Sequence, residues 1–140
     1  MAKSAFVAIL STVALLSGCA ATLKKLNEPR LSYTEYAGEP VKSFYMRSMD
    51  NGWSPVSKDQ LVVFAGINEA YLIKVAGYCP DLQFVNAVGV TNDGGTVDKF
   101  SKVLVGRDKC FIEEIRPIDT KQMKADRKLM KEQMKEADKT

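Results

Sequence analysis

The chain has 140 residues, no histidine, three cysteines and a formal net charge of +3 at pH 7. This length suits one small domain with a modest core rather than two domains. The lack of histidine excludes the commonest general base, the commonest protein metal ligand and every catalytic triad that needs an imidazole.

The first 18 residues have the features of a secretory signal. Lys3 supplies a basic start, residues 5–16 form an uncharged and mainly apolar segment, and Ser17 and Gly18 supply small side chains. A signal of this kind needs those three parts in that order. The apolar segment is too short to span a bilayer comfortably, since a membrane helix needs about 20 apolar residues. We therefore expect residues 1–18 to be an export signal.

The end of this segment resembles the lipid-attachment site of bacterial lipoproteins, because Leu16-Ser17-Gly18-Cys19 matches the pattern Leu-[Ala/Ser]-[Gly/Ala]-Cys at each position. The resemblance implies diacylglycerol on the Cys19 sulfur, cleavage before Cys19 and a third acyl chain on its amine. Such an anchor is essentially permanent. In these lipoproteins an Asp after the cysteine favours the inner membrane, so Ala20 predicts the outer membrane and a periplasmic face. The inner membrane is the alternative location, and an ordinary signal peptide is the alternative reading.

Residues 19–40 predict a lipidated N-terminus and a tether, because their apolar residues are scattered between the breakers Pro29, Gly38 and Pro40. Residues 41–119 predict a β-rich domain with five to seven strands separated by short turns. The expected strands are residues 41–49, 61–64, 70–75, 82–90, 97–105 and 110–115. Apolar content also resumes at Trp53 after the turn at residues 50–52. We expect a mainly β fold, a small antiparallel meander that is barrel-like or a sandwich, with Pro117 ending the last strand.

Residues 120–140 predict a charged C-terminal α-helix over residues 121–137, with Asp119 or Thr120 as its N-cap. This tail contains seven Lys and Arg against four Asp and Glu, whereas residues 20–119 contain 12 against 13. The domain itself is nearly neutral, which gives nucleic-acid binding little support. Two interpretations of the tail stay open: a solvated helical face, and a binding surface for an anionic envelope component.

The two cysteines after Cys19, Cys79 and Cys110, predict a disulfide, since an exported chain meets an oxidising compartment. Buried free thiols and a redox pair are the alternatives. Neither cysteine lies in a Cys-x-x-Cys arrangement. A zinc site would have to combine these cysteines with carboxylates, so we expect no metal and no cofactor.

Few other residues are candidates for chemistry. Glu113 and Glu114 are adjacent carboxylates, but neighbours in a strand point to opposite faces, so an acid and base pair is disfavoured. Residues 92–95 offer oxygen ligands for calcium but lack the 12-residue ligand spacing of an EF-hand, so a β-turn is the favoured explanation. Arg116 is a possible ligand-binding residue for an anion, or it pairs with a carboxylate to hold the last strand. Trp53 and Phe84 could line a pocket or belong to the core.

Several of these segments together resemble a family of small exported bacterial proteins, often lipoproteins, catalogued as a domain of unknown function. The resemblance covers roughly residues 41–119 and implies an exported, disulfide-bonded domain with no assigned activity. The residues that carry it are 61–63, 68–72, Cys79-Pro80, 87–91, Cys110 and Glu114-Ile115-Arg116-Pro117-Ile118-Asp119.

These observations predict a cell-envelope lipoprotein that is not an enzyme. Its β domain would bind an envelope protein or another envelope component. The first alternative is a small-ligand or lipid carrier with a pocket in the mouth of the barrel. A less favoured alternative is a hydrolase that uses carboxylates, which would need a strongly perturbed acid in a cleft.

Overall fold

A computed structural model describes residues 30–139 of the chain. The predicted export signal and Cys19 lie outside the described residues. The chain divides into two units at residues 30 and 31, and all the helices and strands described belong to the second unit, Leu31–Thr140. The predicted tether reached residue 40, whereas the structure places residues 31–40 within the second unit.

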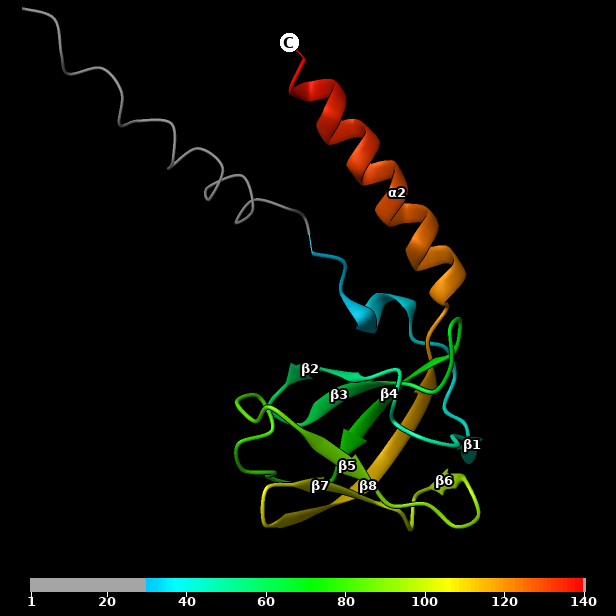
Figure 1. Ribbon diagram of the computed structural model, residues 1–140, viewed down its shortest axis with the longest axis vertical. Coiled ribbons are helices and arrows are strands. Elements are labelled where there is room, and N and C mark those ends of the chain that lie inside the picture. Colours follow the sequence, from blue (N-terminus) through cyan, green and yellow to red (C-terminus); the bar gives the residue numbers. More distant parts are fainter. Residues whose placement is uncertain (1–29, 140) are drawn as a thin grey trace, which may run out of the picture. The chain divides into compact units, whose positions relative to one another are not determined.

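The second unit is mainly β with antiparallel strands and one C-terminal helix, which confirms the predicted fold class (Figure 1). Six strands form one curled sheet in the order β2-β3-β4-β8-β7-β5, and β1 pairs with β6 in a separate two-stranded sheet. The strands are β1 Ser43–Tyr45, β2 Trp53–Ser57, β3 Gln60–Phe64, β4 Ala70–Val75, β5 Val88–Val90, β6 Thr96–Asp98, β7 Lys102–Val105 and β8 Asp108–Pro117.

Both faces of the sheet are buried where β3 and β4 lie. In β3, Leu61 and Val63 belong to the main core, and Val62 between them belongs to a second cluster on the opposite face. In β4 the same alternation separates Ile73 from Leu72. Successive side chains of a strand point to opposite faces, so a strand covered on both sides is apolar along its length. This burial explains the continuous apolar run at residues 61–64.

The second cluster is covered by the segment before β1 and by the start of the C-terminal helix α2, Thr120–Ala137. A short 3-10 helix, η1 Tyr33–Tyr36, lies in that segment. Its neighbour Ala37 forms a β-bridge with Ile118, just after β8. Leu31 and Tyr33 pack against the buried cluster of Val62, Ala70, Leu72, Ile118 and Met123. The residues expected to form a tether therefore close one face of the sheet.

Three of the predicted strands differ from those observed. Residues 41–49 contribute only the three residues of β1, which leaves the main sheet and pairs with β6. Residues 82–90 contribute only β5, because the chain turns at Asp81, whose φ is 61°. Residues 97–105 are split into β6 and β7, since the Asp98 carboxylate accepts hydrogen bonds from the backbone N–H groups of Phe100 and Ser101. Local side-chain bonds of this kind compete with sheet pairing.

A disulfide joins Cys79 to Cys110, as predicted, across a sequence separation of 31 residues. Cys110 lies in β8 and Cys79 lies in the loop after β4, and both are buried. The bond ties that loop to the centre of the sheet, because β8 pairs with both β4 and β7.

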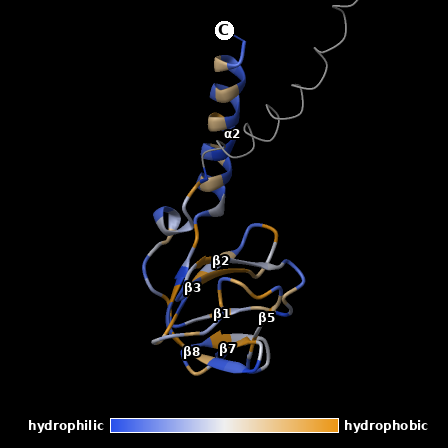
Figure 2. Ribbon diagram, turned by 90° about the vertical axis from the view of Figure 1, so that its left-hand side faces the viewer, coloured by the Kyte–Doolittle hydropathy of each residue, from blue (hydrophilic) through white to orange (hydrophobic). Residues whose placement is uncertain are grey.

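The helix α2 begins as the sequence predicts. The Asp119 carboxylate accepts a hydrogen bond from the Gln122 backbone N–H at 2.9 Å, which satisfies one of the free donors of the first turn. Met123 is the buried residue of this helix, so most of α2 has little contact with the sheet (Figure 2). Among the described residues, no helix has the length and apolar character needed to cross a membrane.

Candidate functional site

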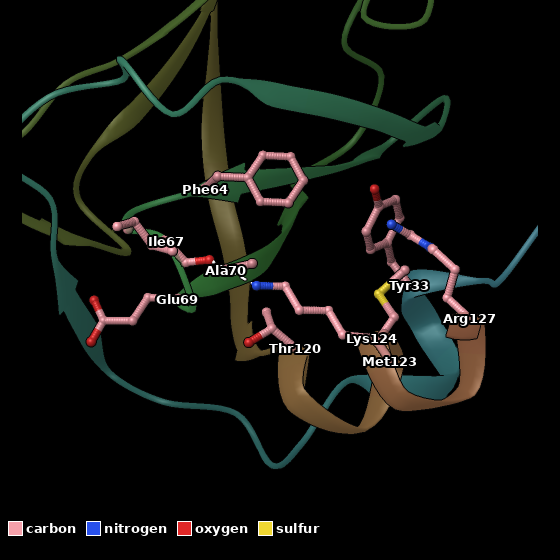
Figure 3. A pocket seen from close by; sticks show the side chains of 10 residues that line it. Tyr33, Phe64, Ile67, Glu69, Ala70, Thr120, Met123, Lys124 and Arg127 are labelled. Atoms are coloured by element: carbon pink, nitrogen blue, oxygen red, sulfur yellow. Dashed lines mark hydrogen bonds between the residues drawn. The ribbon is translucent and has the colours of Figure 1, made fainter. Parts of the chain in front are cut away.

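A small pocket lies where α2, η1 and the turn between β3 and β4 meet, and we call it the helix–hairpin pocket (Figure 3). Its cavity volume is about 120 Å³. Apolar side chains form much of its wall, and charged side chains of α2 and of the turn stand at its edge. The pocket is lined by Tyr33, Phe64, Gly66, Ile67, Glu69, Ala70, Thr120, Met123, Lys124 and Arg127.

Hydrogen bonds hold the start of α2 against the turn between β3 and β4. The Thr120 hydroxyl donates to the Asn68 carbonyl oxygen at 2.6 Å. The Lys124 ammonium donates to the Asn68 side-chain oxygen at 2.7 Å and to the Ile67 carbonyl oxygen at 3.2 Å. The carbonyl groups of Ile67 and Asn68 lie in the turn and have no partner in a neighbouring strand, so these bonds satisfy them. The same bonds hold the first turns of α2 against the hairpin.

The other wall of the pocket comes from the 3-10 helix. The ring of Tyr33 meets the ring of Phe64 edge to face, with centroids 6.3 Å apart. The Tyr36 hydroxyl donates a hydrogen bond to the Asp126 carboxylate at 2.8 Å, which fixes η1 against the second turn of α2. This bond to a carboxylate raises the pKa of Tyr36 above its ordinary value of 10.0, so loss of the donor proton requires a higher pH than in a free tyrosine.

The volume of the pocket favours a single side chain of a partner protein over a small organic ligand. Cavities for small organic ligands typically have volumes of about 300–1,000 Å³. At about 120 Å³ the helix–hairpin pocket is well below that range. It is suited to one apolar side chain of a partner, which is how anchor residues of protein interfaces are held.

The edge of the pocket is accessible. Ile67, at the tip of the turn, is 87% exposed, although it is a large aliphatic residue. The Arg127 side chain lies beside Tyr33, and the Glu69 carboxylate points away from the other lining residues (Figure 3). The charge at the mouth of the pocket is therefore mainly that of Lys124 and Arg127.

The residues singled out in the sequence lie elsewhere. Arg116 binds the Glu114 carboxylate through Nε and the Gly38 carbonyl oxygen through Nη1 at 3.3 Å, so it connects β8 to the segment before β1. Trp53 is partly buried and packs against the main core, whereas Phe84 is 82% exposed. Neither of these two aromatic residues lines the helix–hairpin pocket.

Sequence reasoning missed this pocket because its residues come from three separate segments. Tyr33 lies in the predicted tether and Ile67 in a predicted turn, whereas Arg127 lies in a tail for which a solvated face and an anion-binding surface were both open. Only the unusual exposure of an isoleucine would have pointed to the site, and exposure requires a structure.

The paired carboxylates are engaged in ion pairs. The Glu113 carboxylate lies 3.3 Å from the Lys74 ammonium, and Glu114 pairs with Arg116. The Arg116 hydrogen bond lowers the pKa of Glu114, whereas a general acid at neutral pH needs a raised pKa. Within residues 30–139, no three His, Cys, Asp or Glu side chains come close enough together to hold a metal ion.

The lowered pKa of Glu114 predicts a specific dependence of stability on pH. The carboxylate contributes stability above its ordinary pKa of 4.5, and this contribution is lost as pH falls through the lower folded-state value. Between about pH 5 and pH 3, the wild type should therefore lose more stability than Glu114→Gln, as measured by urea unfolding. Glu132→Gln, in the exposed part of α2, serves as the control. Parallel pH profiles for wild type and Glu114→Gln would contradict the assignment.

Comparison with other proteins identifies a family for this chain, but no individual relative of known structure or curated function. No curated protein and no solved structure matches the chain. The match to a family covers residues 1–134, a longer stretch than the predicted residues 41–119. The chain belongs to the family of unknown function DUF6491.

Proposed function

We propose that this protein is a non-enzymatic lipoprotein of the cell envelope, anchored through Cys19 to the outer membrane and facing the periplasm. Its β domain binds an envelope partner at the helix–hairpin pocket. The sequence Leu16-Ser17-Gly18-Cys19 supports the anchor, and Ala20 supports the outer membrane. The Cys79–Cys110 disulfide agrees with an oxidising compartment.

The observation that carries the binding role is the exposed apolar pocket between α2 and the turn after β3. Its volume of about 120 Å³ favours a partner's side chain over a small molecule. Large aliphatic side chains that are exposed beside a pocket are typical of interaction sites when they form part of a larger patch. Ile67 is exposed at the edge of the pocket, and the wall behind it consists of the partly buried Phe64 and the buried Ala70 and Met123.

The anchor is tested by labelling cells with a fatty acid. The wild-type chain should take up the label and be cleaved before Cys19, because only this cysteine follows the lipoprotein pattern. Cys19→Ser should take up no label and accumulate as the precursor. Cys110→Ser is the matched control and should still be labelled. Labelling that persists in Cys19→Ser would refute the anchor.

The pocket is tested separately by site-specific photocrosslinking in intact cells. A photoreactive residue at Ile67 should give a discrete adduct, because this side chain stands at the edge of the pocket. The same residue at Tyr78, which is 80% exposed and does not line the pocket, provides the control. Equal crosslinking at the two positions, or none at Ile67, would contradict the proposed site.

A further inference from the structure

The cations of α2 are gathered on one face. Lys124, Lys128, Lys131 and Lys135 follow the spacing i, i+4, i+7, i+11, which places side chains along one side of a helix. Arg127 lies three residues from Lys124 and four from Lys131, so it borders the same side. We call these five residues the basic face. The side chains of Lys128, Lys131 and Lys135 are all exposed.

The acidic residues of α2 do little to neutralise this face. Asp126 accepts hydrogen bonds from Tyr36 and from the Gln122 side chain. Glu136 lies 3.8 Å from Lys139, outside the basic face. Glu132 lies beside Lys128 and Lys135 on the edge of the face, and the C-cap residue Asp138 follows Lys135 by three residues on the same side. The ion pairs recorded for residues 30–139 leave Lys128, Lys131 and Lys135 without a carboxylate partner.

The basic face begins at the helix–hairpin pocket, because Lys124 and Arg127 belong to both. From this continuity we infer that the partner is an acidic polypeptide segment, which inserts one apolar side chain into the helix–hairpin pocket and lays its carboxylates along the basic face. This inference rests on the proposed function and specifies the chemistry of the partner. It uses two separate observations, an apolar cavity and a row of cations of which Lys128, Lys131 and Lys135 are exposed and have no carboxylate partner in the recorded ion pairs of the described residues.

The structure favours a polypeptide over a membrane surface. Helices that lie on a bilayer usually present bulky residues such as Trp, Phe or Leu on a broad apolar face. The apolar stripe of α2 consists of Met123, Met130, Met134 and Ala137, and Met123 is already buried against the domain. Leu129, which is 56% exposed, lies outside this stripe. A bilayer surface also offers no amino-acid side chain that could insert into the helix–hairpin pocket.

The length of the basic face determines the probe. Lys124 and Lys135 are eleven positions apart, which corresponds to about 16 Å at about 1.5 Å per residue. An extended peptide covers this length with about five or six residues at roughly 3.3 Å each. The probe is therefore a fluorescent peptide of one leucine and about six glutamates. Two versions are made, one with the leucine at the N-terminus and one with the leucine at the C-terminus. A second probe replaces leucine with serine.

Binding is measured by fluorescence anisotropy at low salt with the chain of residues 19–140 carrying Cys19→Ser. The triple variant Lys128→Gln, Lys131→Gln, Lys135→Gln should bind the leucine probe about tenfold more weakly, since each exposed ion pair contributes modestly. The variant Lys42→Gln, Lys58→Gln, Lys109→Gln loses the same charge at exposed positions outside α2 and should bind as the wild type does. Added salt should weaken wild-type binding.

The pocket is tested by the apolar anchor. The wild type should prefer the leucine probe to the serine probe by several-fold, because burying a leucine stabilises the complex. Ile67→Ser should reduce this preference by removing part of the apolar edge. Leu129→Ser, which removes a similar side chain outside the pocket, should leave it unchanged.

Two results would overturn the inference. One is equal binding of the probes by the two triple lysine variants, because the basic face would then have no special role. The other is binding to vesicles of phosphatidylglycerol with no binding of either peptide, which would make α2 a membrane-surface helix. A crosslinked partner at Ile67 together with either result would retain the proposed function and reject only the acidic segment.

Discussion

Cys110→Ser is expected to lower the free energy of unfolding by about 3–4 kcal/mol. In the chain-entropy description, a disulfide stabilises a protein by restricting the unfolded chain, and a closed loop of this length gives a contribution of that size. The bond joins Cys79 and Cys110 across 31 residues. Because stabilities of small domains are commonly about 5–15 kcal/mol, this loss is a large fraction of the total. Urea unfolding of the oxidised protein measures it.

The control for this variant separates the bond from the free thiol that it leaves. Cys79→Ala combined with Cys110→Ala removes both sulfurs and should be destabilised to a similar extent. Both positions are buried, at 2% and 6% exposure, so small apolar replacements suit them. Reduced wild-type protein should unfold at a similar urea concentration to the double variant. Equal stability of oxidised wild type and both variants would refute a stabilising role for the disulfide.

Ile73→Ala is expected to lower the free energy of unfolding by about 3 kcal/mol. Ile73 is fully buried in β4, opposite Leu61 of β3 and Ile115 of β8. Truncation of a buried isoleucine costs about 2–5 kcal/mol, because apolar burial is lost and the surrounding side chains fill the cavity only in part. Urea unfolding with an unchanged m value would show that stability alone has changed.

The chain provides a matched control at Ile67. Ile67→Ala removes the same atoms from a side chain that is 87% exposed, so it should change stability by less than about 0.5 kcal/mol. If the helix–hairpin pocket binds a partner, this variant should reduce binding and retain stability, the reverse of the result for Ile73→Ala. Comparable destabilisation by both substitutions would contradict the observed burial.

The parts of the fold that could be predicted are those determined by local patterns. β3 and β4 follow apolar runs of strand length, and α2 follows a segment without Gly or Pro that begins after a capping residue, Asp119. The disulfide was predicted from the presence of two further cysteines in a chain that we expected to be exported. In each case a few neighbouring residues, or a simple count, contained the information.

The remaining features depend either on side-chain hydrogen bonds that the apolar pattern does not show or on contacts between distant residues. The turn within residues 97–105 arises from a bond between the Asp98 side chain and nearby backbone groups, although the apolar pattern continues through it. Pro55 lies in β2, which a proline tolerates because this strand is at the edge of the sheet. The helix–hairpin pocket requires η1, the β3–β4 turn and α2 together. No local pattern could have joined these segments.

The position of β8 affects when the chain can fold. β8 is the last strand in the sequence, yet it lies between β4 and β7 inside the six-stranded sheet. A chain that has not yet emerged as far as Pro117 therefore leaves β4 paired only with β3 and β7 paired only with β5, so the two halves of the sheet are not joined. Pairing between such distant segments is slow because the intervening loop must first close. Folding of the domain should accordingly wait until nearly the whole chain has been synthesised, which would suit the export that we propose.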